Sequence, residues 1–168
     1  MHVTLRPFTE DLLGVVQPWF EHPEVRRWLG GPDWPAQEFH TDPGIGEMFR
    51  GRRVLRTHSW LAFDSDGEAV AKIGGGVYDR WAAGREEPGP AMGFAYVVDP
   101  RRWRGGYGTA TLLAMMDAPE MADVRVFAAG IEPANVASVR CALAAGMTPE
   151  TTTPDDEGIV YYLLRRGS

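Results

Sequence analysis

The segment from Met92 to Met116 constrains the fold most, because an apolar run passes through a glycine-rich turn directly into a helical pattern. The run Met92–Val98 has the β-branched and aromatic content of a buried strand. Leu112 and Met116 belong to the apolar stripe of the helix that follows. A strand that turns into a helix in this way is one unit of a mixed α/β domain, so we expect a sheet flanked by helices.

The glycine-rich turn is suited to holding an anion. Gly105, Gly106 and Gly108 allow backbone N–H groups to face a ligand, and the positive end of the helix dipole favours phosphate oxygens. Arg104 adds a mobile positive charge. No Lys-Ser or Lys-Thr pair follows the last glycine, so a Walker-type nucleotide loop is not expected. The glycine spacing also misses the full three-glycine fingerprint of a dinucleotide site. The alternative is a tight turn with solvated arginines.

Length and composition indicate one globular domain, 1–168, with 44% apolar residues. No apolar run could span a bilayer, the first residues lack a signal-peptide core, and Cys141 is the single cysteine, which together predict a cytoplasmic protein without a membrane partner. The net charge of −6 argues against a nucleic-acid partner and favours a cationic small molecule. His22, His40 and His58 show no metal-binding spacing, so no metal site is expected.

Hydropathy patterns and turn residues predict strand, two helices, three strands, helix, strand, helix and two strands. The expected strands are 2–7, 58–63, 69–78, 91–98, 124–129, 151–153 and 159–164. The expected helices are 10–20, a short one within 23–29, a short one at 45–49, one opened by the glycines, and 133–146. Residues 80–90 are expected to form a loop, and the arginine-rich stretch 50–56 either to be solvated or to bind a phosphorylated cofactor tail.

Two motifs carry a family resemblance. The segment Trp103–Gly108 resembles the Gln/Arg-x-x-Gly-x-Gly/Ala loop of the GNAT superfamily of acyl-CoA-dependent N-acetyltransferases, with Trp103 at the Gln/Arg position. Glu132–Met147 is similar to the family's second segment, which begins Pro-x-Asn-x-x-Ser. Within the superfamily the chain resembles the aminoglycoside 6′-N-acetyltransferases. A tryptophan at the position of Trp103 also resembles the ribosomal-protein N-acetyltransferase branch. The implied fold is α/β, with a GNAT-like mixed, mostly antiparallel central sheet flanked by helices.

The resemblance implies acetyl-CoA as co-substrate and direct transfer to an amine in a ternary complex, without a metal. It places the pantetheine arm along Val97 and Val98, with Asn135 and Ser138 beside it. Asn135 is equally suited to be a helix N-cap. The residues implied for the pyrophosphate loop are Arg104, Gly105, Gly106, Tyr107, Gly108 and Thr109.

The candidate catalytic residues are Asp79 and Tyr96. Asp79 is the first choice for the base that receives the ammonium proton, with a solvated aspartate as the alternative. Tyr96 is the candidate acid for the departing thiolate, with core packing as the alternative. The chain departs from the aminoglycoside enzymes where Phe94 and Gly130 replace acidic residues and Ala142 replaces the family's tyrosine.

We therefore expect an acetyltransferase that acts on a small, cationic, aminoglycoside-like amine and works as a monomer or a homodimer. Trp103 supports a second interpretation, acetylation of a protein N-terminus. Phe94 and Ala142 support a third, an acyl-CoA-binding module without catalysis.

Overall fold

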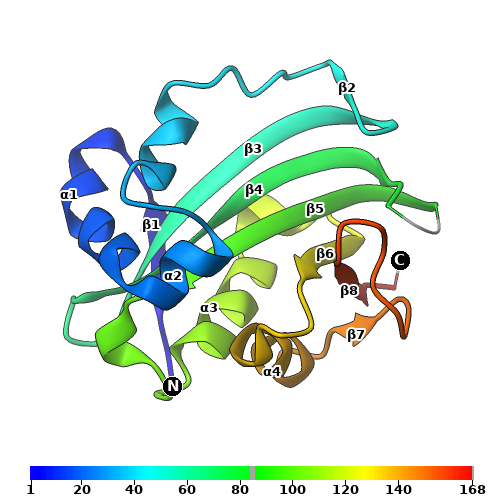
Figure 1. Ribbon diagram of the computed structural model, residues 1–168. Coiled ribbons are helices and arrows are strands. Elements are labelled where there is room, and N and C mark those ends of the chain that lie inside the picture. The colour runs from blue at the N-terminus through cyan, green and yellow to red at the C-terminus, as the bar shows by residue number, and fades with distance from the viewer. Residues whose placement is uncertain (84–85, 168) are drawn as a thin grey trace.

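The computed structural model describes residues 1–83 and 86–167 (Figure 1). The strands are β1 (Thr4–Pro7), β2 (Met48–Phe49), β3 (Arg52–Phe63), β4 (Ala69–Trp81), β5 (Glu87–Val98), β6 (Val126–Ile131), β7 (Thr148–Pro149) and β8 (Val160–Arg165). The α-helices are α1 (Leu13–Val16), α2 (Pro23–Trp28), α3 (Tyr107–Met116) and α4 (Val136–Ala144). Turns of 3-10 helix are η1 (Glu10–Leu12), η2 (Gln17–Glu21), η3 (Trp34–Phe39), η4 (Pro100–Arg102) and η5 (Pro119–Met121).

The strands form one mixed sheet in the order β1-β3-β4-β5-β6-β8-β7, with β2 paired to β3. Every neighbouring pair is antiparallel except β5 and β6, which are parallel. The expectation of a mixed α/β fold with a mostly antiparallel central sheet is therefore confirmed.

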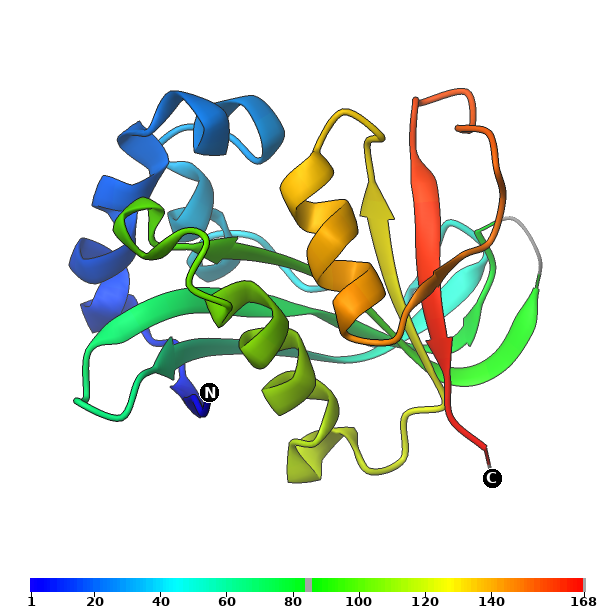
Figure 2. The same ribbon diagram turned by 90° about the horizontal axis from the view of Figure 1, so that it is seen from below.

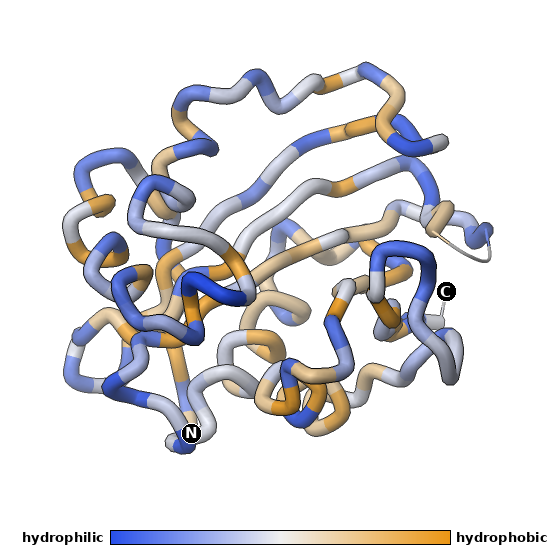
Figure 3. The backbone as a smooth tube through the Cα atoms, viewed as in Figure 1, coloured by the Kyte–Doolittle hydropathy of each residue, from blue (hydrophilic) through white to orange (hydrophobic). Residues whose placement is uncertain are grey.

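Alternate side chains of the central strands pack into two separate cores. Ile73 and Phe94 point to the face that carries α3 and α4, where they join a cluster with Leu112 (Figure 2). Val97 points to the opposite face and packs with Phe20 under the N-terminal helical turns. In Figure 3 the apolar parts of the chain lie along the strands and on α3 and α4, whereas the turn between β7 and β8 is hydrophilic.

The feature that shapes the rest of the molecule is the separation of β5 from β6. Their pairing runs from Ala91 opposite Val126 to Gly93 opposite Ala128 and then stops, although β5 continues to Val98. Beyond Gly93 the two strands diverge (Figure 2). The last part of β5 therefore has β4 on one side and no strand on the other.

Three predicted elements differ in the structure. Residues 45–49 do not form a helix, because the turn at Arg50 and Gly51, with φ of 50° and 83°, folds Met48–Phe49 back on β3 as strand β2. The strand predicted at 151–153 is wrong, since β8 pairs on its outer side with β7, Thr148–Pro149, and on its other side with β6. The helix predicted over 10–20 is divided into α1 and 3-10 turns, with Pro18 inside η2.

The loop predicted at 80–90 is shorter than expected, because β4 and β5 stay paired through Trp81 opposite Glu87. Within that stretch, residues 84–85 lie outside the described residues. Residues 50–56 fall in or beside β3, and Arg56, the last of them, is six residues from Ala62, which pairs with Ala71 and lies at the α3 end of the sheet. Six residues of strand span about 20 Å, and the other arginines of the stretch lie farther away, so none of them is placed at the glycine-rich turn.

Candidate functional site

The open edge of β5 presents backbone polar groups without a strand partner. The N–H of Asp99 donates to Val70 O on the β4 side at 2.9 Å, and Pro90 O accepts from Arg125 on the β6 side at 2.8 Å. Backbone groups alternate along a strand, so those of Phe94, Tyr96 and Val98 face the side from which β6 has departed. The carbonyl oxygen of Val98 accepts a hydrogen bond from the Trp103 indole at 3.0 Å.

The same alternation separates two residues that the sequence places together. Val97 pairs with Lys72 in the β4 ladder and its side chain is buried in the core. Val98 turns its amide to the open edge. Of the two, Val98 is the one that offers a backbone donor to a ligand there.

The open edge leads to the N-terminus of α3. Gly106 precedes the helix with φ of 85°, a left-handed conformation that glycine adopts without strain, and its carbonyl accepts the N–H of Ala110 at 3.1 Å. The N–H groups of Tyr107, Gly108 and Thr109 therefore have no acceptor within the helix. Together with the exposed residues 104–106 they form a compact turn with free N–H groups, which is the backbone geometry that the predicted anion site needs.

The close approach of α3 to α4 requires a glycine at position 108. A Cβ at this position would lie 2.7 Å from the Sγ of Cys141 on α4, and 3.6 Å from a ring carbon of Tyr96. Only glycine fits without a shift of its neighbours. The narrow contact brings the start of α3, the open edge of β5 and the first turns of α4 to one place, which is the arrangement that an acyl-CoA with its amides and pyrophosphate requires.

A hydrogen-bonded chain crosses from β5 to α4. The Tyr96 hydroxyl donates to Ser138 Oγ at 3.3 Å, and the Ser138 N–H donates to Asn135 Oδ1 at 3.4 Å. Asn135 is therefore the N-cap of α4, one of the two roles considered for it. Burial, with a further contribution from Cys141, raises the pKa of Tyr96 well above its usual value, so the phenol stays protonated at neutral pH.

Asp79 lies apart from this chain. It sits at an irregularity in the β4–β5 register, and its Oδ1 accepts the N–H of Arg53 at 2.8 Å. Tyr96 pairs with Ile73, and six residues of strand, or about 20 Å, separate Ile73 from Asp79. The structure thus brings Tyr96, Ser138 and Asn135 together and leaves Asp79 outside that group.

On the face of the sheet opposite α3 and α4, small residues of β4 and β5 leave a surface without large side chains, which we call the floor. Gly74 and Gly76 of β4 lie beside Ala95 and Gly93 of β5, and Ala95 is exposed although it belongs to a central strand. The ring of Tyr78 folds back over Gly76, where a Cβ would be 3.0 Å from its hydroxyl. The floor ends at this ring.

A cavity of about 300 Å³ lies beyond the floor. Its lining is Arg50, Arg52, Ala82, Ala83, Asp155, Asp156, Glu157 and Tyr161. Sequence reasoning did not single out Tyr161 and considered Arg52 only within the stretch 50–56, although the alternation of strands β3 and β8 was the signal that could have placed them. The three acidic residues come from the β7–β8 turn, and the Asp155 carboxylate accepts the N–H groups of Glu157 and Ile159, each at 2.9 Å.

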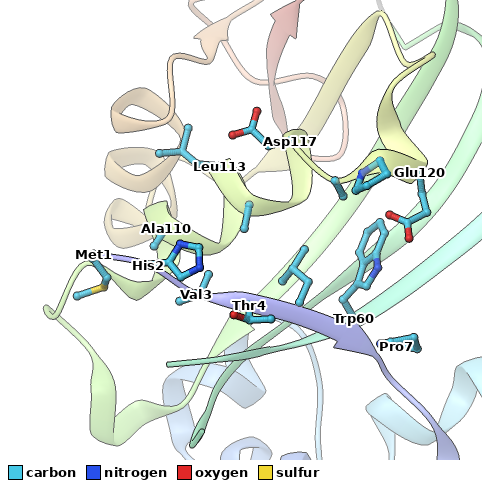
Figure 4. Close-up of a pocket in the computed structure, with 14 residues that line it drawn as sticks. Met1, His2, Val3, Thr4, Pro7, Trp60, Ala110, Leu113, Asp117 and Glu120 are labelled. Carbon is cyan, nitrogen blue, oxygen red and sulfur yellow. The ribbon is translucent and has the colours of Figure 1, made fainter. Parts of the chain in front are cut away.

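A larger cavity, of about 530 Å³, lies between β1 and the side of α3 (Figure 4). Ala110 and Leu113 line it from α3, Trp60 lines it from β3, and His2 lines it from the segment before β1. It is a separate surface, because α3 meets α4 through Gly108 on another side. Within 1–83 and 86–167, no group of three His, Cys, Asp or Glu side chains could hold a metal ion.

Comparison with known proteins agrees with this geometry. The family model described as Acetyltransferase (GNAT) domain matches residues 2–148. The uncharacterized N-acetyltransferase YfmK of Bacillus subtilis (strain 168) is 29% identical over 161 residues, which are 93% of this chain and 92% of that protein.

Solved structures share the fold at low sequence identity. The structure of AAC(6')-Ib with paromomycin and acetyl-CoA superposes with a TM-score of 0.75 at 20% identity, over 99% of this chain and 94% of that chain. An aminoglycoside N(6')-acetyltransferase from Legionella pneumophila superposes with a TM-score of 0.71 at 14% identity, over 98% of this chain and 92% of that chain. No helix in the described part of the chain is long and apolar enough to cross a membrane. The matched domain extends over most of the sequence, and the chain therefore belongs to the GNAT family of acetyltransferases, which use acetyl-CoA as co-substrate.

Proposed function

We propose that the protein transfers an acetyl group from acetyl-CoA directly to the primary amine of a small molecule that is cationic at neutral pH, within a ternary complex. The observation that carries the proposal is the open edge of β5, which ends at the N-terminus of α3. A ligand with peptide-like amides next to a pyrophosphate suits an unpaired strand edge that leads to a helix N-terminus.

The chain's own residues supply the contacts for acetyl-CoA. In this proposal the backbone groups of Tyr96 and Val98 bind the pantetheine amides. The N–H groups at positions 107–109 bind the pyrophosphate, with Arg104, Gly105 and Gly106 completing the turn. Asn135 and Ser138 line the α4 side of the gap. Val97 contributes through the ladder that holds the strand straight and not through its own amide.

Tyr96 is proposed as the acid that protonates the departing thiolate. Ala142 stands at the position of the family's tyrosine and has no proton to give. Ser138 is four residues before Ala142 and therefore lies on the same face of α4. The Tyr96 hydroxyl, which donates to Ser138, reaches that face from β5. In this proposal the proton donor therefore lies on strand β5, whereas the family's tyrosine lies at the position of Ala142 on helix α4.

The amine is proposed to approach from the bare floor of Gly74, Gly76, Gly93 and Ala95. Acetyl-CoA supplies the thioester that the amine attacks. The acidic turn at 155–157 gives this side of the molecule a negative potential that attracts an ammonium group. Asp79 lies three residues of strand, or about 10 Å, beyond Gly76 and would receive the ammonium proton through water.

Release of CoA thiol, followed by colour development with a thiol reagent, tests the function. Purified protein with acetyl-CoA is supplied in turn with aminoglycosides, polyamines, amino acids and peptides with a free N-terminus. Turnover of a small amine and of no peptide is the expected result. Turnover of peptides alone would assign the enzyme to protein N-termini. Binding of acetyl-CoA without turnover of any acceptor would contradict catalysis.

A further inference from the structure

Arg52, the first residue of β3, is buried beside aromatic rings and lines the same cavity as the acidic turn at 155–157. Its exposure is 8%, and it forms no ion pair with a described carboxylate. The guanidinium carbon lies 3.8 Å from the centre of the Tyr78 ring and 4.5 Å from that of the Trp81 ring. Among the described residues, Nη1 of Arg52 has no hydrogen-bond partner.

This position is costly for a residue that serves only the fold. Burial lowers the pKa of Arg52 from its usual value, but an arginine remains charged in proteins. Aromatic faces attract a cation, yet an unpaired buried donor still loses its hydrogen bonds to water. An oxygen with negative charge would satisfy both the guanidinium charge and the unpaired N–H.

The unpaired nitrogen lies at the boundary of the proposed amine site. A Cβ built on Gly93 would be 3.8 Å from Arg52 Nη1, and Gly93 is the last residue of β5 that pairs with β6. Arg52 also lines the cavity of about 300 Å³. The guanidinium therefore faces the region where the floor meets the separated strands.

A second buried donor belongs to the same cluster. The indole Nε1 of Trp81 is also without a hydrogen-bond partner in the described part of the chain. The Trp81 ring contacts Arg52 and stands edge-on to Tyr161, another residue of the cavity lining, at 5.4 Å. Two unpaired N–H donors in one aromatic cluster are unusual, because native interiors leave few such groups.

We propose that Arg52 binds a carboxylate of the acceptor, so that the substrate is a cationic amine that also carries a carboxylate, such as an amino acid with a second ammonium group. The inference rests on the proposed function, since it needs the amine to enter from the floor. It narrows the substrate class: aminoglycosides and polyamines have amines but no carboxylate. The acidic turn at 155–157 then faces the ammonium part of the same zwitterion, opposite the guanidinium.

Matched acceptors test the proposal. Thiol release is measured with free L-amino acids, their amides and the amines that lack the carboxylate. A charge-assisted hydrogen bond contributes enough to favour the free acid over its amide by about 10-fold to 100-fold in kcat/KM. In R52M, which keeps an apolar side chain against Tyr78, that ratio should fall to near one while the KM for acetyl-CoA stays unchanged. The control R53M alters the next, exposed arginine and should keep the ratio.

Two outcomes overturn the proposal: a wild-type enzyme that prefers amides, polyamines or aminoglycosides, or an R52M variant that keeps the preference for the acid. If no acceptor is turned over although acetyl-CoA binds, the proposed function fails. The carboxylate site is then measured separately, by calorimetric binding of N-acetyl amino acids and their amides to the protein saturated with CoA. Preference for the acid in wild type and its loss in R52M would support the site, and equal binding would refute it.

Discussion

The hydroxyl of Tyr96 on β5 and the Oγ of Ser138 on α4 are joined by a hydrogen bond of 3.3 Å across the gap between strand and helix. This contact ties the strand that lost its neighbour to the helix that follows β6. In the proposed mechanism it also holds the protonated phenol that would give its proton to the departing thiolate.

Tyr96→Phe removes that proton donor and little else. If Tyr96 is the acid, kcat should fall about 100-fold or more, the usual contribution of a positioned acid, while acetyl-CoA binding changes little. Steady-state kinetics and a binding titration separate the two effects. Ser138→Ala is the matched control, since it removes the partner and keeps the phenol. An unchanged kcat in Tyr96→Phe would mean that Tyr96 is not the acid and serves only to pack the core.

The raised pKa of Tyr96 has a signature in stability. The folded state holds the phenol proton more tightly than the unfolded chain does, so this contribution is complete below the unfolded value of about 10 and declines as the pH rises past it. We expect the free energy of unfolding of wild type to fall between about pH 10 and pH 11 more steeply than that of Tyr96→Phe. Urea denaturation at each pH measures both. Parallel slopes would contradict the burial of the hydroxyl.

Gly108→Ala should disturb both the fold and the cofactor site. The new methyl would overlap Cys141 Sγ, and overpacking of this kind costs about 1–3 kcal/mol. We expect a lower melting temperature and weaker CoA binding. The double variant Gly108→Ala with Cys141→Ala removes the overlapping sulfur and should recover most of the loss. Failure of the second change to help would contradict the overlap with the sulfur as the cause, because the nearest atoms of Tyr96 and Val98, at 3.6 Å, are in ordinary contact.

The ion pair of Lys72 and Glu38 is expected to matter for stability. Lys72 Nζ lies 2.8 Å from Glu38 Oε1, with only 8% of the lysine side chain exposed against 32% for the glutamate. Glu38→Gln leaves a buried ammonium without its anion and should cost roughly 2–4 kcal/mol, at or below the range for fully buried pairs. Chemical denaturation measures the loss. Adding Lys72→Met should restore stability, because the uncompensated charge is then gone.

Two substitutions of Asp79 test separately the charge of its carboxylate and its hydrogen bond to the backbone of Arg53. Its carboxylate caps the N–H of Arg53, so Asp79→Ala should lower stability by about 1 kcal/mol through the lost hydrogen bond. Asp79→Asn keeps an acceptor oxygen and removes the charge. If Asp79 receives the proton, both variants lose turnover, whereas a structural role predicts loss of stability in Asp79→Ala and wild-type kinetics in Asp79→Asn.

Local signals were enough to predict the strand through Tyr96, the glycine-rich turn and the N-cap at Asn135. Each of these depends on residues close together in the sequence. The turn at Arg50–Gly51 was local as well, but an arginine with positive φ is rare and gives no composition signal. That is why residues 45–49 were predicted to be helical.

The remaining parts of the site depend on strand register. Whether Val97 or Val98 turns its amide to the open edge follows from pairing with β4, which no short stretch of sequence encodes. In the cluster of Arg52, Tyr78 and Trp81, Tyr78 is the last residue of its predicted strand, whereas Arg52 and Trp81 lie beyond the predicted ends of theirs. A prediction that stops a strand early loses the residues at its end, and here those residues border the proposed acceptor site.

The short pairing between β5 and β6 has a consequence for turnover. Between Gly93 and Val98 the sheet is completed, on the proposed binding mode, by the pantetheine arm instead of a strand. Each release of CoA then breaks hydrogen bonds at the edge of the sheet, and each binding of acetyl-CoA forms them again. On this binding mode, turnover would be limited by the rate at which CoA leaves the open edge of β5.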